Sequence, residues 1–118
     1  MRKSLALAAA IGLTLLGGSA VRAQLGGDLQ RATNLARMTA EKINGGLNRY
    51  FAANCMHSRD GGSCLIGSSA QGFSFRFLGG PPGWEVYHQA ATVETQILVA
   101  PSGTQVVQVH YNGPPRGN

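Results

Sequence analysis

Acidic side chains are few, because the chain has five Asp+Glu among its 118 residues. They include no close pair suited to glycoside cleavage, which needs two carboxylates flanking one bond. The serines lack the Gly-x-Ser-x-Gly spacing of a hydrolase nucleophile, and the glycine-rich run 79–83 lacks the lysine and hydroxyl of a phosphate-binding loop. The sequence therefore predicts a protein that is not an enzyme and has no cofactor. A small hydrolase with an unrecognised site is an alternative.

Clusters of basic residues are also missing. The chain has ten Lys+Arg, and no three of them are consecutive. Three of the ten (Arg2, Lys3 and Arg22) lie in an N-terminal segment that we expect to be removed, which leaves seven against five acidic residues and a net charge of +2. Because affinity for phosphates depends on clustered basic side chains, nucleic acid is not an expected partner.

A hydrophobic run long enough to cross a membrane is absent as well. The apolar run Leu5–Leu16 has twelve residues, whereas a spanning helix needs about 20. It follows the basic pair Arg2-Lys3 and precedes Val21-Arg22-Ala23, in which the small or modest side chains at positions 21 and 23 suit signal peptidase. Residues 1–23 are thus predicted to be a Sec-type signal peptide cleaved after Ala23. One small domain, 24–118, would remain without a stable membrane anchor, in the bacterial periplasm or secreted.

Cysteine occurs twice, as Cys55 and Cys64, and both residues belong to the predicted mature domain. An even pair in an oxidising compartment predicts a disulfide. The eight residues between the two are polar and flexible, and closing such a ring contributes about 2.5–3 kcal/mol in the chain-entropy model. The spacing differs from the Cys-x-x-Cys of redox-active pairs, which favours a structural bridge.

Histidine, with three copies, offers few metal ligands. The run Cys55-Met56-His57 combines donors that suit Cu(I), and a zinc site would need His88 and His110 to become neighbours. No His-x-x-x-His pair is present, and the predicted disulfide uses Cys55. We therefore predict that the chain has no metal site. The alternative is a periplasmic copper- or zinc-handling protein whose ligands would be Met56, His57, His88 and His110.

A helix is predicted over residues 28–53, because apolar side chains recur there at intervals of three and four. This stripe comprises Leu29, Ala32, Ala36, Ala40, Ile43, Leu47 and Tyr50/Phe51. Asn44-Gly45-Gly46 interrupts it, and two glycines cost about 2 kcal/mol in a helix interior. Since the stripe stays in phase from Ile43 to Leu47, we expect the helix to continue through the glycines with a kink.

The rest of the domain is predicted to be a loop followed by strands. The loop 55–72 contains a short extended piece at 64–66. In Phe73-Ser74-Phe75-Arg76-Phe77 the three phenylalanines share one face. Further strands are expected at 84–87, 92–100 and 104–111, and the tail 112–118, with two prolines, is expected to be disordered. In the last strand, Val107, Val109 and Tyr111 should face the core.

These elements define an α+β fold, in which one long helix packs on an antiparallel meander of three or four strands. The helix covers one face of the sheet and leaves the other open. By alternation, the open face should carry Ser74, Arg76, Glu94, Gln96, Leu98, Val106, Gln108 and His110.

Aromatic residues are sparse, and the single tryptophan, Trp84, directly follows the turn 79–83 with Tyr87 nearby. Aromatic side chains beside loops anchor partners, whereas large aromatics are mostly buried. Trp84 is therefore either a partner contact or the end cap of the core, and Tyr87 and Arg76 are further candidate contacts. The sequence favours a non-enzymatic binding or interaction module of the bacterial envelope, with a protein or an envelope component as its partner.

The predicted cleavage site can be read directly from exported protein. Material recovered from the periplasm or the medium should begin at Gln24, because the peptidase accepts the small residues before it. N-terminal sequencing together with intact mass measures this. Protein that starts at Met1, retained in the cytosol with two free thiols, would contradict the prediction.

Overall fold

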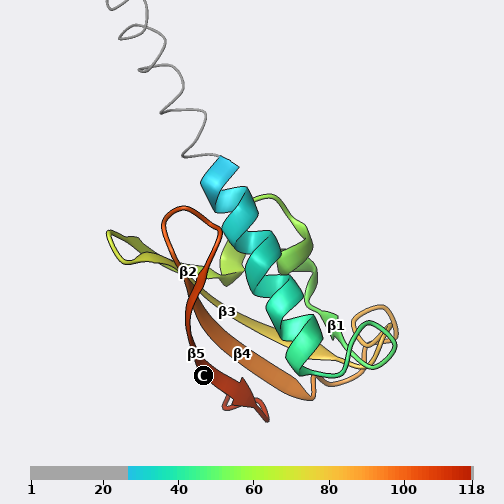
Figure 1. Cartoon of the computed structure of the whole chain (residues 1–118). Helices are drawn as coiled ribbons and strands as arrows, with labels where there is room; N and C mark the ends of the chain where they lie inside the picture. Colours follow the sequence, from blue (N-terminus) through green and yellow to red (C-terminus); the bar gives the residue numbers. More distant parts are fainter. Residues whose placement is uncertain (1–26, 118) are drawn as a thin grey trace, which may run out of the picture.

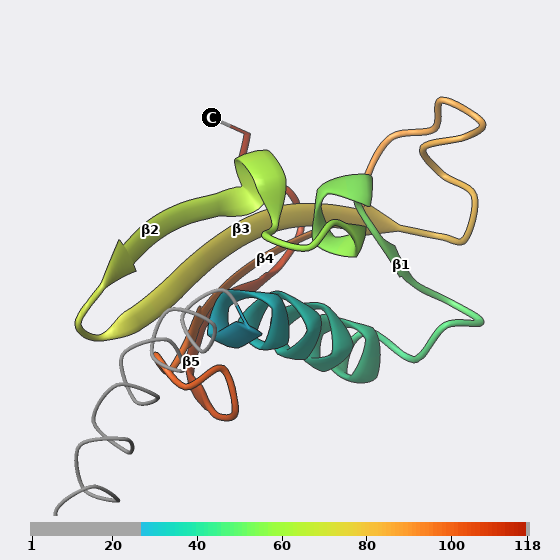
Figure 2. The same ribbon diagram turned by 90° about the horizontal axis from the view of Figure 1, so that it is seen from above.

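The computed structural model describes residues 27–117, so the predicted signal peptide 1–23 lies outside the described residues. A helix over residues 27–43 packs on one face of an antiparallel sheet (Figure 1 and Figure 2), which confirms the predicted α+β fold. The strands are β1 (Phe51–Ala52), β2 (Leu65–Ser69), β3 (Gly72–Gly80), β4 (Val93–Val99) and β5 (Val106–Gly113), and the 3-10 helices η1 (Asn54–His57) and η2 (Gly62–Cys64) precede β2.

The helix contacts the sheet through small side chains. Ala32, Ala36 and Ala40 are fully buried and belong to the same core cluster as Phe75 and Ile97. Methyl side chains allow the helix backbone to approach the sheet closely, so the aromatic rings of β3 fill the space between the layers. Within residues 27–117, no helix combines the length and the apolar character needed to cross a membrane.

The helix ends at residue 43, so the predicted continuation to residue 53 is wrong. Gly45 and Gly46 have φ angles of 100° and 87°, which a right-handed helix does not accommodate. The backbone N–H of Gly46 donates to the carbonyl of Glu41 at 2.7 Å and closes the last turn. The two glycines therefore terminate the helix, and Leu47, which the periodicity placed on the buried stripe, is exposed.

One edge of β3 is paired with two short strands, while its other edge pairs with β4. β1 pairs with β3 at Gly79 and Gly80, and β2 pairs with it from Gly72 to Phe75. The chain between β1 and β2 leaves this edge as η1 and η2. The arrangement is that of a single edge strand interrupted by a loop.

The predicted disulfide between Cys55 and Cys64 is confirmed, and it closes the neck of that loop. The two Cα atoms lie 6.0 Å apart, and both cysteines pack against the core cluster. Met56, in η1, is fully buried, and its carbonyl accepts a hydrogen bond from Arg37 of the helix at 3.1 Å. The bridged loop is therefore part of the folded domain.

Two register shifts in the pairing of β4 with β5 change which side chains of β5 face the core. Gln96 is opposite Tyr111, and Ile97 is opposite Val109, so the chain gains one residue between these pairs. Because partners in an antiparallel pair share a face, Tyr111 lies on the open face with Gln96. The prediction that Tyr111 faces the core with Val107 and Val109 is wrong for this reason.

The second register shift turns Val106 from the open face toward the core. Val99 is opposite Val106, which packs against the core, whereas the alternation placed Val106 on the open face. Val107 is the extra residue there and is 55% exposed. The alternation does hold in β3, where Phe75 and Phe77 are buried as predicted.

Residues 84–87 form turns and not the predicted strand. The N–H of Tyr87 donates to the carbonyl of Gly83 at 2.9 Å, and the N–H of His88 donates to Glu85 at 3.2 Å. These local bonds use the backbone groups that a ladder would need. Gly83 and His88 have φ angles of 86° and 56°, which turn the chain back on itself.

Tyr50 fixes the path from the helix to β1. Its side chain lies against the backbone of Gly79, where a Cβ atom would overlap the ring. The residue is 1% exposed, and among residues 27–117 its hydroxyl makes no hydrogen bond of good geometry, although the nearby Thr95 side chain acts to lower its pKa. Burial raises the pKa of Tyr50 to about 12 from 10.0. Ring packing against the sheet, and not the hydroxyl, therefore holds this residue.

Replacing Tyr50 with Phe should leave the free energy of unfolding at pH 7 unchanged or raise it by about 1 kcal/mol, because an unsatisfied buried donor disappears. Above pH 10 the unfolded tyrosine ionises while the folded one keeps its proton, so wild-type stability falls as the pH rises from about 10 to 12. The Tyr50→Phe variant should lose less over this range. Urea titrations of both proteins measure the difference.

The matched control is Tyr87→Phe, which changes an exposed tyrosine. Its alkaline stability profile should follow that of the wild type. Equal losses in Tyr50→Phe and wild type would contradict the role of the buried hydroxyl, and a large loss of stability at pH 7 would show that the hydroxyl has a partner.

Candidate functional site

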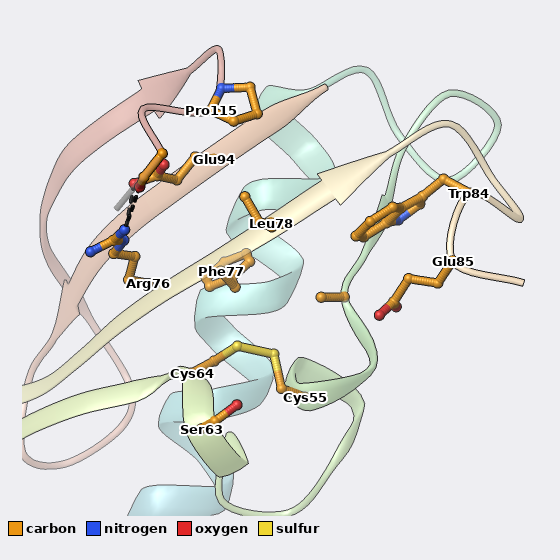
Figure 3. A pocket seen from close by; sticks show the side chains of 12 residues that line it. Cys55, Ser63, Cys64, Arg76, Phe77, Leu78, Trp84, Glu85, Glu94 and Pro115 are labelled. Atoms are coloured by element: carbon orange, nitrogen blue, oxygen red, sulfur yellow. Dashed lines mark hydrogen bonds and ion pairs between the residues drawn. A yellow bond between two sulfur atoms is a disulfide. The ribbon is translucent and has the colours of Figure 1, made fainter. Parts of the chain in front are cut away.

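A cleft of about 680 Å3 opens on the face of the sheet that the helix does not cover (Figure 3). Leu78, 40% exposed, is the main apolar side chain of its floor. The cleft is lined by Ala53, Cys55, Ser63, Cys64, Arg76, Phe77, Leu78, Trp84, Glu85, Glu94, Pro115 and Gly117. Five separate segments of the chain therefore meet around one hollow.

The bridged loop forms one wall of the cleft. The disulfide and Ser63 lie beside β3, next to the stretch of its edge between the β1 and β2 pairings (Figure 3). The backbone N–H of Ala53 donates to the carbonyl of Leu78 at 2.8 Å, and that of Asn54 donates to Glu85 Oε1 at 2.8 Å. This wall is thus closed by the disulfide and hydrogen-bonded where it leaves β1.

Trp84 lies at one end of the cleft and is 7% exposed. Its indole Nε1 donates to the carbonyl of Phe51 at 2.8 Å. The ring rests on Gly80, where an added Cβ atom would lie 3.0 Å from it. Trp84 was predicted to be either a partner contact or the end cap of the core. The structure supports the end cap, although part of the residue also lines the cleft.

A second hollow of about 260 Å3 lies on the other side of Trp84. Phe51, Pro82 and Val86 line it, together with Trp84 and Glu85. Tyr87, a predicted partner contact, is 73% exposed and lines neither hollow. Arg76, the third predicted contact, lines the main cleft at the end opposite Trp84 (Figure 3).

The C-terminal tail forms the remaining wall, which differs from the disordered tail that we expected. Residues 114–117 fold back over the open face, and Pro115 and Gly117 line the cleft. Tyr111 donates from its hydroxyl to the carbonyl of Pro114 at 2.6 Å, and Arg76 Nη2 donates to the carbonyl of Gly117 at 2.9 Å. The tail lacks a strand partner but gains these side-chain bonds, which sequence patterns do not report.

Glu94 is the residue that holds the tail. Its carboxylate is 2% exposed and accepts hydrogen bonds from Arg116 at the backbone N (2.8 Å), Nε (3.0 Å) and Nη2 (2.6 Å). Arg76 Nε lies 3.1 Å from the same oxygen, Oε2 (Figure 3). One carboxylate thus binds two guanidinium groups, one from β3 and one from the C-terminal tail.

Electrostatics keep Glu94 ionised. The backbone N–H of Arg116 is the largest influence that lowers the pKa of this carboxyl, and the guanidinium groups of Arg116 and Arg76 lower it further. Burial acts in the opposite direction but is outweighed, so the pKa lies below its ordinary value. The carboxylate therefore keeps its charge, and its contact with the tail, to a lower pH than an ordinary glutamate would.

The alternative metal ligands are not gathered in one place. Met56 is buried in the core and the cysteines are oxidised, so the Cys55-Met56-His57 donor set is engaged elsewhere. His57 stacks on Phe51 with ring centroids 4.5 Å apart, and His88 and His110 are both exposed. Among residues 27–117, no three His, Cys, Asp or Glu side chains are placed to hold a metal ion.

Comparison of the chain with protein-family models, curated proteins and solved structures finds no match. Sequence reasoning placed Arg76 and Glu94 on one face but missed Arg116, since a Pro/Gly-rich end resembles a frayed tail. The available signal was a lone arginine between proline and glycine, three residues beyond the end of β5.

Glu94 predicts a specific acid dependence of stability. Its folded-state pKa lies below the unfolded one, so its stabilisation is complete above the unfolded pKa and is lost as the pH falls through the folded pKa. The Glu94→Gln and Arg116→Ala variants should both show a shallower fall in the free energy of unfolding between pH 6 and pH 3, measured by urea titration.

Arg31→Ala serves as the control, because it breaks an exposed ion pair with Asp28 on the helix. It should keep the wild-type acid profile. If Glu94→Gln also keeps that profile, the carboxylate contributes nothing to folding through its two arginines.

Proposed function

We propose that this chain is an exported binding module of the bacterial envelope that holds a protein or envelope component in the cleft of its open sheet face. One observation carries the proposal: an apolar floor at Leu78 lies between a disulfide-closed wall and a charged end at Arg76 and Glu94. The volume of about 680 Å3 falls in the range typical of ligand pockets.

The bridged loop and the Trp84 end of the cleft favour binding because they are fixed before a partner arrives. The Trp84–Phe51 and Asn54–Glu85 bonds join segments 33 and 31 residues apart, and the disulfide closes the loop between residues nine apart. A site that needs little ordering loses less conformational entropy when it binds. The combination of apolar floor and charged end suits a ligand that carries both kinds of group, as an extended peptide does.

Export rests on two features. The disulfide is the kind of bond that persists in oxidising compartments, and the N-terminal segment has the layout of a signal peptide. A periplasmic or secreted location places the cleft among envelope proteins and extracellular partners, which explains the need for a covalent staple in a domain this small.

Site-specific photo-crosslinking in the producing cells tests the proposal. A photoreactive residue in place of Ser63, at the rim of the cleft, should give a discrete adduct with an envelope partner. The same residue at Thr104, an exposed position between β4 and β5, should not give that adduct. The adduct is read by immunoblot and identified by mass spectrometry.

Leu78→Arg introduces a charge on the floor of the cleft and should abolish the Ser63 adduct. Leu47→Arg is the matched control, because Leu47 is 59% exposed and lies outside the cleft. An adduct that survives Leu78→Arg, or one that disappears equally in both variants, would rule out the cleft as the binding surface.

A further inference from the structure

We propose that the charged end of the cleft is a binding site for an arginine side chain, filled in this structure by the chain's own Arg116, and that an arginine-bearing extended peptide of the partner takes its place. The site consists of Glu94, Gln96 and Tyr111, which we call the arginine cage. This inference rests on the proposed function and names the chemistry of the ligand.

The cage contacts the guanidinium group on both its edge and its face. Nε and Nη2 of Arg116 donate to Glu94 Oε2 at 3.0 and 2.6 Å, and Nη2 also donates to Gln96 Oε1 at 3.0 Å. The guanidinium carbon lies 3.8 Å from the centre of the Tyr111 ring. A carboxylate, an amide oxygen and an aromatic face together select arginine over lysine, whose compact ammonium cannot stack and bond in the same plane.

The strands hold the cage independently of the tail. Glu94 and Gln96 lie two residues apart on β4, and Tyr111 is opposite Gln96 on β5 because of the first register shift. Arg76 of β3 binds the Glu94 carboxylate from the other side at 3.1 Å. Removal of Arg116 would therefore leave the carboxylate paired with Arg76 and leave the three cage residues at neighbouring positions of β4 and β5.

The present occupant is attached lightly. Arg116 is 42% exposed, and the core cluster contains no residue of the tail 114–117. Besides the Arg116 contacts, the tail is held by the bonds from Tyr111 to Pro114 and from Arg76 to Gly117. All of these can be exchanged for equivalent bonds to another peptide, so the tail can leave without opening the core.

The cage is continuous with the cleft, which defines the ligand further. Glu94 and Pro115 line the cleft with Leu78 and Trp84. A peptide that places arginine in the cage would therefore lay its neighbouring residues along the apolar floor, where a proline or an aliphatic side chain fits. The tail itself has this character, since two prolines precede its arginine.

The tail competes with any external arginine. A short tether keeps Arg116 at an effective local concentration in the millimolar range, so a free peptide must overcome it. Full-length protein with Arg116→Ala vacates the cage without shortening the chain. We therefore expect this variant to bind arginine peptides that the wild type binds only weakly.

The experiment titrates the Arg116→Ala protein with three hexapeptides, Gly-Pro-Pro-X-Gly-Asn with X as Arg, Lys or Ala, and follows the backbone amide signals of β4 and β5 by NMR. The arginine peptide should shift the signals of Glu94, Gln96 and Tyr111. It should bind at least roughly tenfold more tightly than the lysine or alanine peptide, a ratio that corresponds to one charge-assisted hydrogen bond. Wild-type protein should bind it more weakly than the variant.

The double variant Glu94→Gln, Arg116→Ala is the matched control and should lose the preference for arginine. Arg116→Lys keeps the tail charge but loses the planar guanidinium group, so its tail should compete less with the arginine peptide than the wild-type tail does. Circular dichroism verifies that each variant is folded. Equal affinity for all three peptides, or an unchanged affinity in the double variant, overturns the arginine cage. So does a concentration-dependent dimer of the wild type whose tail occupies the cage of a second copy.

Failure here is distinguishable from failure of the proposed function. If Leu78→Arg abolishes the envelope adduct while the peptides show no preference for arginine, the cleft is a binding site but its ligand does not use the cage. If the adduct is independent of Leu78 while the peptides do prefer arginine, the cage holds and the cleft does not serve the partner.

Discussion

The disulfide between Cys55 and Cys64 is the constraint on which the open face of the sheet depends. It turns an interrupted edge strand into one continuous border of β3, with β1 and β2 on either side of the bridge. Because the loop is closed at its neck, η1 can place Met56 in the core and still leave a wall beside Leu78. Without the bridge, the loop that borders both the edge of β3 and the cleft would no longer be closed at its neck.

Charged side chains form the wall of the cleft on the side away from the disulfide. Glu94 is buried on the open face of the sheet, outside the core cluster. The two arginines around it come from β3 and from the C-terminal tail. A buried carboxylate that lost both partners would be strongly destabilising, whereas departure of the tail alone leaves Glu94 paired with Arg76 of β3. The domain therefore has a covalent wall and an ionic wall around one apolar floor.

The pattern of side chains predicted the layers of this fold but not its irregularities. Alternation in Phe73–Phe77 and the alanine stripe of the helix report burial directly, and the spacing of Cys55 and Cys64 reports the bridge. The end of the helix depended on whether Gly45 and Gly46 adopt positive φ angles, which periodicity does not encode. The arginine cage could not be predicted from the sequence pattern, because a bulge places Tyr111 on the open face and tertiary bonds hold Arg116.

The two bulges of β5 have a consequence for the outer border of the sheet. A regular terminal strand presents an even row of amide and carbonyl groups, onto which another polypeptide can add and start an aggregate. β5 contains no Lys, Arg, Asp or Glu to repel such an addition, and its exposed Val107 and Val109 would favour it. The extra residues break the spacing of that row, so this margin resists amyloid-like growth through geometry where charge is lacking.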